Sequence, residues 1–84
     1  MPEPRRGTFR QVRQLLRWMN YRRMRQDGSH ERWYGPNGER VTVDGPDGRT
    51  VTHPLWGWML DQMRLTEDEF WRLYELRGHS EQRR

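Results

Sequence analysis

The residue best suited to acid–base chemistry in this chain is a histidine in the stretch DGSHERWYG, residues 27–35. An imidazole with an unperturbed pKa of about 6.5 can accept or donate a proton near neutral pH. Cleavage of RNA without a metal needs a base for the 2′-hydroxyl, cations for the charge that develops on the phosphate, and an acid for the leaving oxygen. His30 is therefore a candidate general acid or base. The alternative is that His30 is a polar residue at the start of a strand.

The neighbours of His30 suit a phosphate ligand. Alternate residues of a strand share one face, so a strand over 30–34 places His30 and Arg32 together, and we expect Arg40 beside them on the next strand. Gly28 can let a phosphate approach the backbone, and Ser29 can orient either the phosphate or the imidazole. We expect Glu31 on the core side, where it would be a second catalytic group only if the register differs. Three arginines of the preceding segment extend the predicted RNA surface: Arg22, Arg23 and Arg25.

The sequence gives little support for other kinds of catalytic or binding site. The chain has no cysteine, which excludes disulfides, thiolate zinc sites and thiol nucleophiles. His53 and His79 lie on separate segments from His30, without the spacing of a zinc site. Neither Gly-Pro-x-Gly stretch resembles a nucleotide-binding loop before a helix. We therefore expect no metal and no cofactor.

The charge is concentrated in the N-terminal half. All sixteen cations are arginine, and residues 5–25 hold eight of them and no acid. This distribution favours a polyanionic partner, although arginine-rich codon usage with a solvated face would give the same composition. No apolar run has the length of a signal peptide or a membrane span, so we expect a soluble, cytoplasmic protein without a membrane partner.

Local patterns predict the elements that would position these residues. Thr8 and Gln11 form a capping box, and the helix that follows should end near Asn20. Its apolar stripe is Phe9, Val12, Leu15, Leu16 and Met19, and its opposite side carries a basic ridge, Arg10, Arg13 and Arg17.

Turn signals predict the strands. Pro36-Asn37-Gly38 suits a hairpin loop that pairs Trp33 with Val41 and Glu31 with Val43. GPNGERVTVD at 35–44 is followed by the similar GPDGRTVTHP at 45–54, which predicts a further strand with Val51 opposite Val43. Residues 21–26 form a weaker candidate strand.

Two helices should complete the domain. The first begins near Pro54, and the second begins with a Thr66–Glu69 capping box and ends at Gly78. Their apolar stripes are Trp56, Met59, Leu60 and Met63, then Phe70, Leu73, Tyr74 and Leu76. Trp33, Trp56 and Trp71 are expected in the core. Trp18 and Trp58 fall off the stripes and are either base-stacking or partner-binding residues, or residues at the core edge.

The predicted fold is therefore α+β. One helix precedes a three- to four-stranded antiparallel sheet, two helices follow, and all helices cover one face so that the other stays open. The predicted domain covers 8–77, between flexible tails at 1–7 and 78–84.

Three segments together resemble the HicA toxins of bacterial type II toxin–antitoxin systems: LLRWMNYRRMRQDGSH, GPNGERVTV and WMLDQMRLTEDEF, within residues 11–76. The resemblance implies a fold like the double-stranded-RNA-binding domain. It also implies metal-independent cleavage of mRNA by the histidine of Gly-Ser-His, here His30, and a HicB-type antitoxin that neutralises the toxin, which we expect to cover the His30 face.

The sequence also departs from the HicA pattern. The family commonly has a Lys- and Gly-rich loop where residues 44–53 predict a strand here, and Trp56 and Trp58 replace smaller residues. Two other interpretations remain beside a HicA-type endoribonuclease. One is a non-catalytic RNA- or DNA-binding module of the same fold, and the other is a protein-interaction domain whose basic face binds an acidic partner.

Overall fold

The computed structural model describes residues 5–82, and its first helix begins at the predicted capping box. In α1 (Phe9–Trp18) the Thr8 hydroxyl accepts a hydrogen bond from the Gln11 amide at 3.2 Å, and the Gln11 side chain accepts one from the Thr8 amide at 2.9 Å. The chain leaves the helix at Asn20, which has a left-handed φ of 65°. This end prevents Arg23 from entering the apolar stripe, as predicted.

Three antiparallel strands follow in the order β1 (Arg22–Asp27), β2 (His30–Tyr34) and β3 (Arg40–Val43). The hairpin register is confirmed, since Trp33 lies opposite Val41 and Glu31 opposite Val43. The weaker candidate strand at 21–26 is also real. It is exposed along its whole length as β1, with a bulge between Arg23 and Arg25.

The predicted pairing of Val43 with Val51 is wrong. Residues 44–54 form no strand of the sheet. A turn does form in this segment, where the Arg49 amide donates a hydrogen bond to the Pro46 carbonyl at 3.0 Å. The segment then pairs with residues 7–9 at the start of α1: the Val51 amide donates to the Gly7 carbonyl at 2.8 Å, and the Phe9 amide donates to the Arg49 carbonyl at 3.0 Å. Val51 is still buried, but it reaches the core from a loop.

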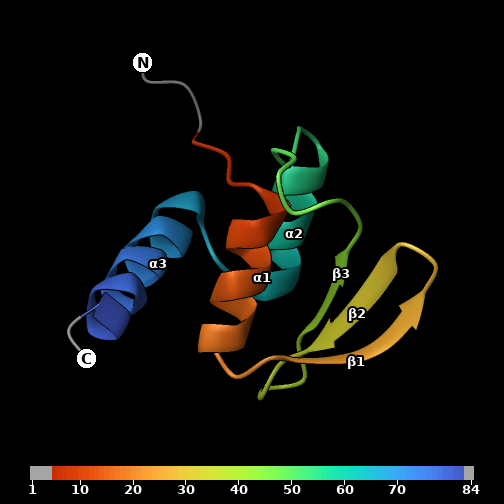
Figure 1. Ribbon diagram of the computed structural model, residues 1–84, viewed down its shortest axis with the longest axis horizontal. Helices are drawn as coiled ribbons and strands as arrows, with labels where there is room; N and C mark the ends of the chain where they lie inside the picture. The colour runs from red at the N-terminus through yellow and green to blue at the C-terminus, as the bar shows by residue number, and fades with distance from the viewer. Residues whose placement is uncertain (1–4, 83–84) are drawn as a thin grey trace.

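Two helices complete the fold, α2 (Leu55–Met63) and α3 (Glu67–Gln82). The α2 stripe is buried as predicted, and the capping box at Thr66 and Glu69 is present. Two predictions for α3 are wrong: Leu76 is 60% exposed, and the helix continues past Gly78. The reason is that no helix-breaking residue follows Gly78, so the helix extends beyond the edge of the core it packs on. Figure 1 shows its C-terminal end lying away from the sheet.

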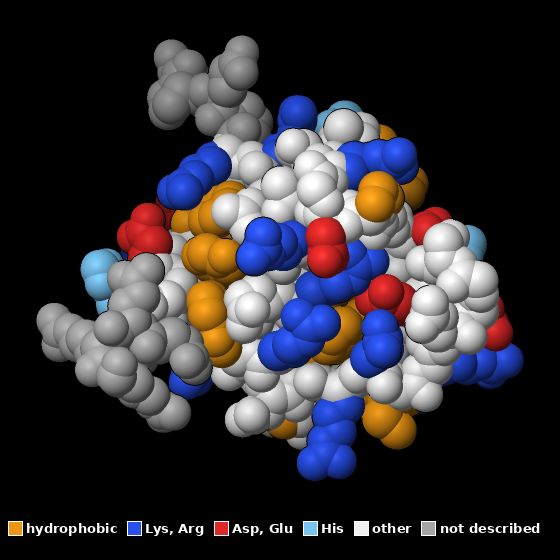
Figure 2. Space-filling model, in the orientation of Figure 1, with side chains coloured by type: hydrophobic (Ala, Val, Ile, Leu, Met, Phe, Trp, Pro, Cys, Tyr) orange, Lys and Arg blue, Asp and Glu red, His pale blue; other side chains and the backbone are white. Residues whose placement is uncertain are grey.

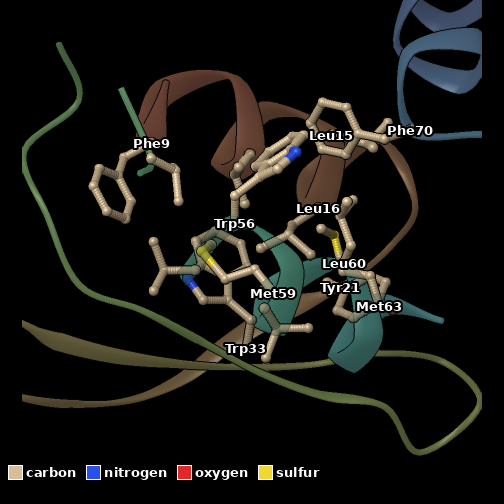
Figure 3. Packing of buried hydrophobic residues seen from close by; sticks show 14 of the residues in the cluster. Phe9, Leu15, Leu16, Tyr21, Trp33, Trp56, Met59, Leu60, Met63 and Phe70 are labelled. Atoms are coloured by element: carbon tan, nitrogen blue, oxygen red, sulfur yellow. The ribbon is translucent and has the colours of Figure 1, made fainter. Parts of the chain in front are cut away.

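One core joins the three helices, β2, β3 and the loop that carries Val51, whereas β1 contributes no buried residue to it (Figure 3). Alternate residues of β2 and β3 are buried against it, whereas His30, Arg32 and Tyr34 are exposed. The sheet therefore has one covered and one open face, as predicted. The buried hydrophobic residues are Phe9, Val12, Leu15, Leu16, Tyr21, Trp33, Val41, Val43, Val51, Trp56, Met59, Leu60, Met63, Phe70 and Trp71.

The two tryptophans off the helical stripes differ from each other. Trp18 is half-buried, and its ring centre lies 5.2 Å from that of Tyr74, which makes it a residue at the core edge. Trp58 is exposed.

Contacts and helical structure extend outside the predicted 8–77 at both ends. The Arg5 carbonyl accepts a hydrogen bond from the Trp71 indole at 2.8 Å, and the Arg5 guanidinium lies 4.0 Å from the centre of that ring. At the other end α3 runs to Gln82. The remaining residues of the predicted tails, 1–4 and 83–84, lie outside the described residues.

Candidate functional site

His30 stands at the tip of the β1–β2 hairpin, on the open face of the sheet. Gly28 and Ser29 form the turn between the strands, and Gly28 has a φ of 60°, a backbone conformation that glycine adopts without steric strain. His30 is the first residue of β2 and lies opposite Asp27. Its side chain is 62% exposed, so a ligand can reach the imidazole from solvent.

Asp44 contacts His30 and was not among the residues predicted for the site. Its Oδ2 lies 3.1 Å from His30 Nε2. A carboxylate at this distance can accept a hydrogen bond when Nε2 carries the proton, and Nδ1 is then the proton acceptor of the neutral ring. The predicted hairpin register already implied this pair. With Glu31 opposite Val43, the next position along the two antiparallel strands places Asp44 opposite His30.

A buried arginine holds the strand and the loop that carry this pair. Arg13 Nε donates to Glu31 at 3.1 Å, Nη1 donates to Asp47 at 2.6 Å, and Nη2 donates to the Gly45 carbonyl at 2.6 Å. Glu31 is the neighbour of His30 in the chain, and Gly45 is the neighbour of Asp44. One guanidinium therefore joins both sides of the His30–Asp44 contact to α1. We call Arg13, Glu31, Gly45 and Asp47 the Arg13 clamp.

The clamp corrects the predicted basic ridge of α1. Arg10 and Arg17 are exposed, but Arg13 is buried because the loop after β3 folds over it and supplies its acceptors. Figure 2 shows arginine side chains gathered over α1, with acidic side chains among them.

The contacts of Glu31 indicate a role in holding the fold together. Burial by itself raises the pKa of this carboxyl, but hydrogen bonds from Arg13 and Trp33 and the charges of Arg13 and Arg23 outweigh it, so the pKa falls below its ordinary value. The Trp33 indole donates to the same oxygen as Arg13, at 3.0 Å. Glu31 is thus an ionised, buried partner of the clamp on the core side of β2.

A cleft of about 490 Å³ opens beside the His30–Asp44 contact. Ser29 and Asp44 line it together with Gln26 and Arg49. Arg49 is exposed and was also missed by sequence reasoning, because the segment containing it was assigned to a strand. The cleft therefore combines a hydroxyl, an amide, carboxylates and arginines, and Asp44 connects it to His30, which does not itself line it.

The predicted arginines are distributed along the whole sheet. Arg32 is exposed two residues from His30, but Arg40 lies opposite Tyr34 at the far end of β2, so the expected position of Arg40 beside His30 is not observed. In β1, Arg25 Nε lies 3.3 Å from Asp27 and Arg23 Nη1 lies 3.8 Å from Glu31. The last predicted position, Arg22, is opposite Tyr34.

Among the side chains that the structure describes, residues 5–79, no group of three or more His, Asp or Glu residues is placed to hold a metal ion. The helices within residues 5–82 are also too short or too polar to cross a bilayer.

Comparison with protein-family models gives no match to the chain, and comparison with curated proteins finds no significant relative.

Proposed function

We propose that this protein is a metal-independent endoribonuclease that cleaves mRNA, of the kind found in HicA toxins. The observation that carries the proposal is the distance of 3.1 Å between His30 Nε2 and Asp44 Oδ2, with the His30 side chain 62% exposed to solvent. The order of helix, antiparallel sheet and two helices is compatible with a fold like the double-stranded-RNA-binding domain.

In the proposed reaction, His30 Nδ1 removes the proton from a ribose 2′-hydroxyl. The 2′-oxygen forms a bond to the adjacent phosphorus, the bond from phosphorus to the 5′-oxygen breaks with its electron pair going to that oxygen, and the 5′-oxygen takes up a proton from solvent water. The imidazolium then releases its proton to solvent. Asp44 holds the imidazole in one tautomer and stabilises the imidazolium that forms, as carboxylates do in other acid–base pairs. Arg32 and Arg49 are the exposed cations that can bind the phosphate, since both are near this end of the sheet.

The same face suits an inhibitory partner. Arg32 and Arg49 are exposed and form no ion pair among the side chains that the structure describes, so an acidic surface could pair with them and cover His30. We therefore keep a HicB-type antitoxin as the proposed protein partner.

The test is cleavage of a labelled mRNA in EDTA by the wild-type protein, His30→Ala, Asp44→Asn and a matched control, His79→Ala, which changes an exposed histidine of α3. Loss of acid–base catalysis reduces rates by about 10²- to 10⁴-fold, so we expect His30→Ala to be nearly inactive and Asp44→Asn to be slowed. The control should cleave like the wild type. Circular dichroism would verify that each variant is folded. Intact RNA after incubation with folded wild-type protein refutes the proposal, and full activity of His30→Ala refutes the site.

The unpaired arginines favour a second candidate, a non-catalytic RNA- or DNA-binding module. Arg32, Arg40 and Arg49 could bind phosphates whether or not the strand is cut. Binding that weakens steeply with salt is expected for both candidates, so turnover distinguishes them.

A further inference from the structure

A second cleft lies at the other end of β2 from His30. Its volume is about 620 Å³, which is within the range of about 300 to 1,000 Å³ typical of sites for small ligands. It lies where the chain passes from α1 to β1, next to the end of β2. The residues that define it are Arg17, Asn20, Arg22, Met24, Tyr34 and Pro36.

This cleft has an exposed apolar lining. Met24 is 59% exposed and Tyr34 is 38% exposed, and both line it. Large apolar side chains that gather at one exposed site often mark a binding surface. An aromatic ring in such a place offers a flat surface for a planar ligand.

The charge around the cleft is positive. Arg17 and Arg22 line it, no aspartate or glutamate does, and neither arginine has an ion-pair partner in the described part of the chain. The Arg40 guanidinium lies 5.3 Å from the centre of the Tyr34 ring and adds a third cation. Arginines beside an exposed aromatic ring are the combination by which proteins bind single-stranded nucleic acid.

We propose that this cleft binds one unpaired nucleotide of an RNA strand, with its base against Tyr34 and Met24 and its phosphate on Arg17 and Arg22. The proposal extends the proposed function, because His30 and Tyr34 share the open face of β2 at a separation of about 13 Å along the strand. A single strand that lies along β2 reaches both sites. A duplex keeps its bases paired and stacked, so it cannot place one on Tyr34, and the site selects single-stranded RNA.

The test is fluorescence anisotropy of a labelled single-stranded RNA oligomer with the full-length His30→Ala chain, which prevents cleavage during the titration. Tyr34→Ala should weaken binding about tenfold, because one base–aromatic stack is lost. Tyr34→Phe, which keeps the ring, should restore the affinity. The matched control is Leu76→Ala, which removes an exposed apolar side chain on α3 and should leave binding unchanged. An RNA duplex should bind with no dependence on Tyr34.

Equal affinity of Tyr34→Ala and its parent for the single strand would overturn this inference, even if the wild-type protein cleaves mRNA. Complete absence of RNA binding would overturn it as well and would favour a protein ligand. A Tyr34-dependent affinity in a protein whose wild type leaves RNA intact would support the nucleotide site and refute the nuclease proposal. The two proposals therefore fail in different ways.

Discussion

Replacement of Arg13 by methionine would test the Arg13 clamp, because methionine keeps much of the volume and removes the charge. The carboxylate of Glu31 would stay buried, with the Trp33 indole as its remaining hydrogen-bond donor and Arg23 at 3.8 Å as its nearest cation. The Gly45 carbonyl and Asp47 would each lose their bond to Arg13 as well. Arg13→Met thus leaves a buried charge without its main partner.

The expected loss is large for so small a protein. Removal of one partner of a buried ion pair lowers the free energy of unfolding by about 3 to 5 kcal/mol. A domain of 84 residues has a total stability of about 4 to 13 kcal/mol at about 0.05 to 0.15 kcal/mol per residue. The Arg13→Met protein should therefore retain only a small free energy of unfolding. Glu31→Gln in that background should recover part of the loss, with a coupling energy of about 2 kcal/mol, because the glutamine keeps an acceptor for Trp33 without the charge.

The pH dependence has a definite sign. In the wild type the pKa of Glu31 lies below its ordinary value, so the pair adds stability above the unfolded pKa and loses it as the pH falls through the folded pKa. Without Arg13 the pKa of Glu31 should rise from its wild-type value, because the hydrogen bond and the charge of Arg13, two of the causes that lower it, are lost. Relative to the wild type, the stability deficit of Arg13→Met is then smallest at low pH, where Glu31 is protonated in both proteins, and it grows as the pH rises from the lowered pKa of the wild type to the higher pKa of the variant.

Urea denaturation followed by tryptophan fluorescence would measure these free energies for the wild type, both single variants and the double variant. The measurements would be made at about pH 4 and pH 7, on either side of the ordinary glutamate pKa of about 4.3. Additive single-variant effects, or a deficit of Arg13→Met that does not change with pH, would refute the interpretation that Glu31 carries the charge that Arg13 stabilises.

Two further predictions concern the loop after β3 and the end of α1. A Cβ on Gly45 would overlap the Phe9 ring, so Gly45→Ala should lower the free energy of unfolding by about 1 to 3 kcal/mol in the same urea assay, whereas Gly48→Ala, which has open space, should be nearly neutral. Burial, followed by the charge of Glu39, raises the pKa of Tyr21 to about 12. Stability should therefore fall as the pH rises above the ordinary tyrosine pKa of about 10, and absorbance titration should show one late tyrosinate that Tyr21→Phe removes.

Most of the secondary structure could be predicted because its causes are local. The capping boxes at Thr8 and Thr66 need only residues three positions apart, and the apolar stripes of α1 and α2 follow from helical periodicity. The turn at Pro36-Asn37-Gly38 sets the register of β2 and β3, and with it the exposure of His30. The catalytic candidate and its face were therefore accessible from the sequence alone.

The partners of the site residues depended on the tertiary structure. The spacing of Arg13 in the sequence predicts a position on the solvent-facing side of α1. Arg13 is buried only because the loop after β3 folds over α1, and its guanidinium then bonds both the strand of His30 and the segment of Asp44. That loop was itself assigned wrongly, because its turn and β-branched residues suit a strand but the backbone partner came from residues 7–9 instead of β3. A residue pattern specifies which side of an element faces the core. It does not specify which distant segment supplies the hydrogen-bond partners, because that choice depends on the packing of the whole chain.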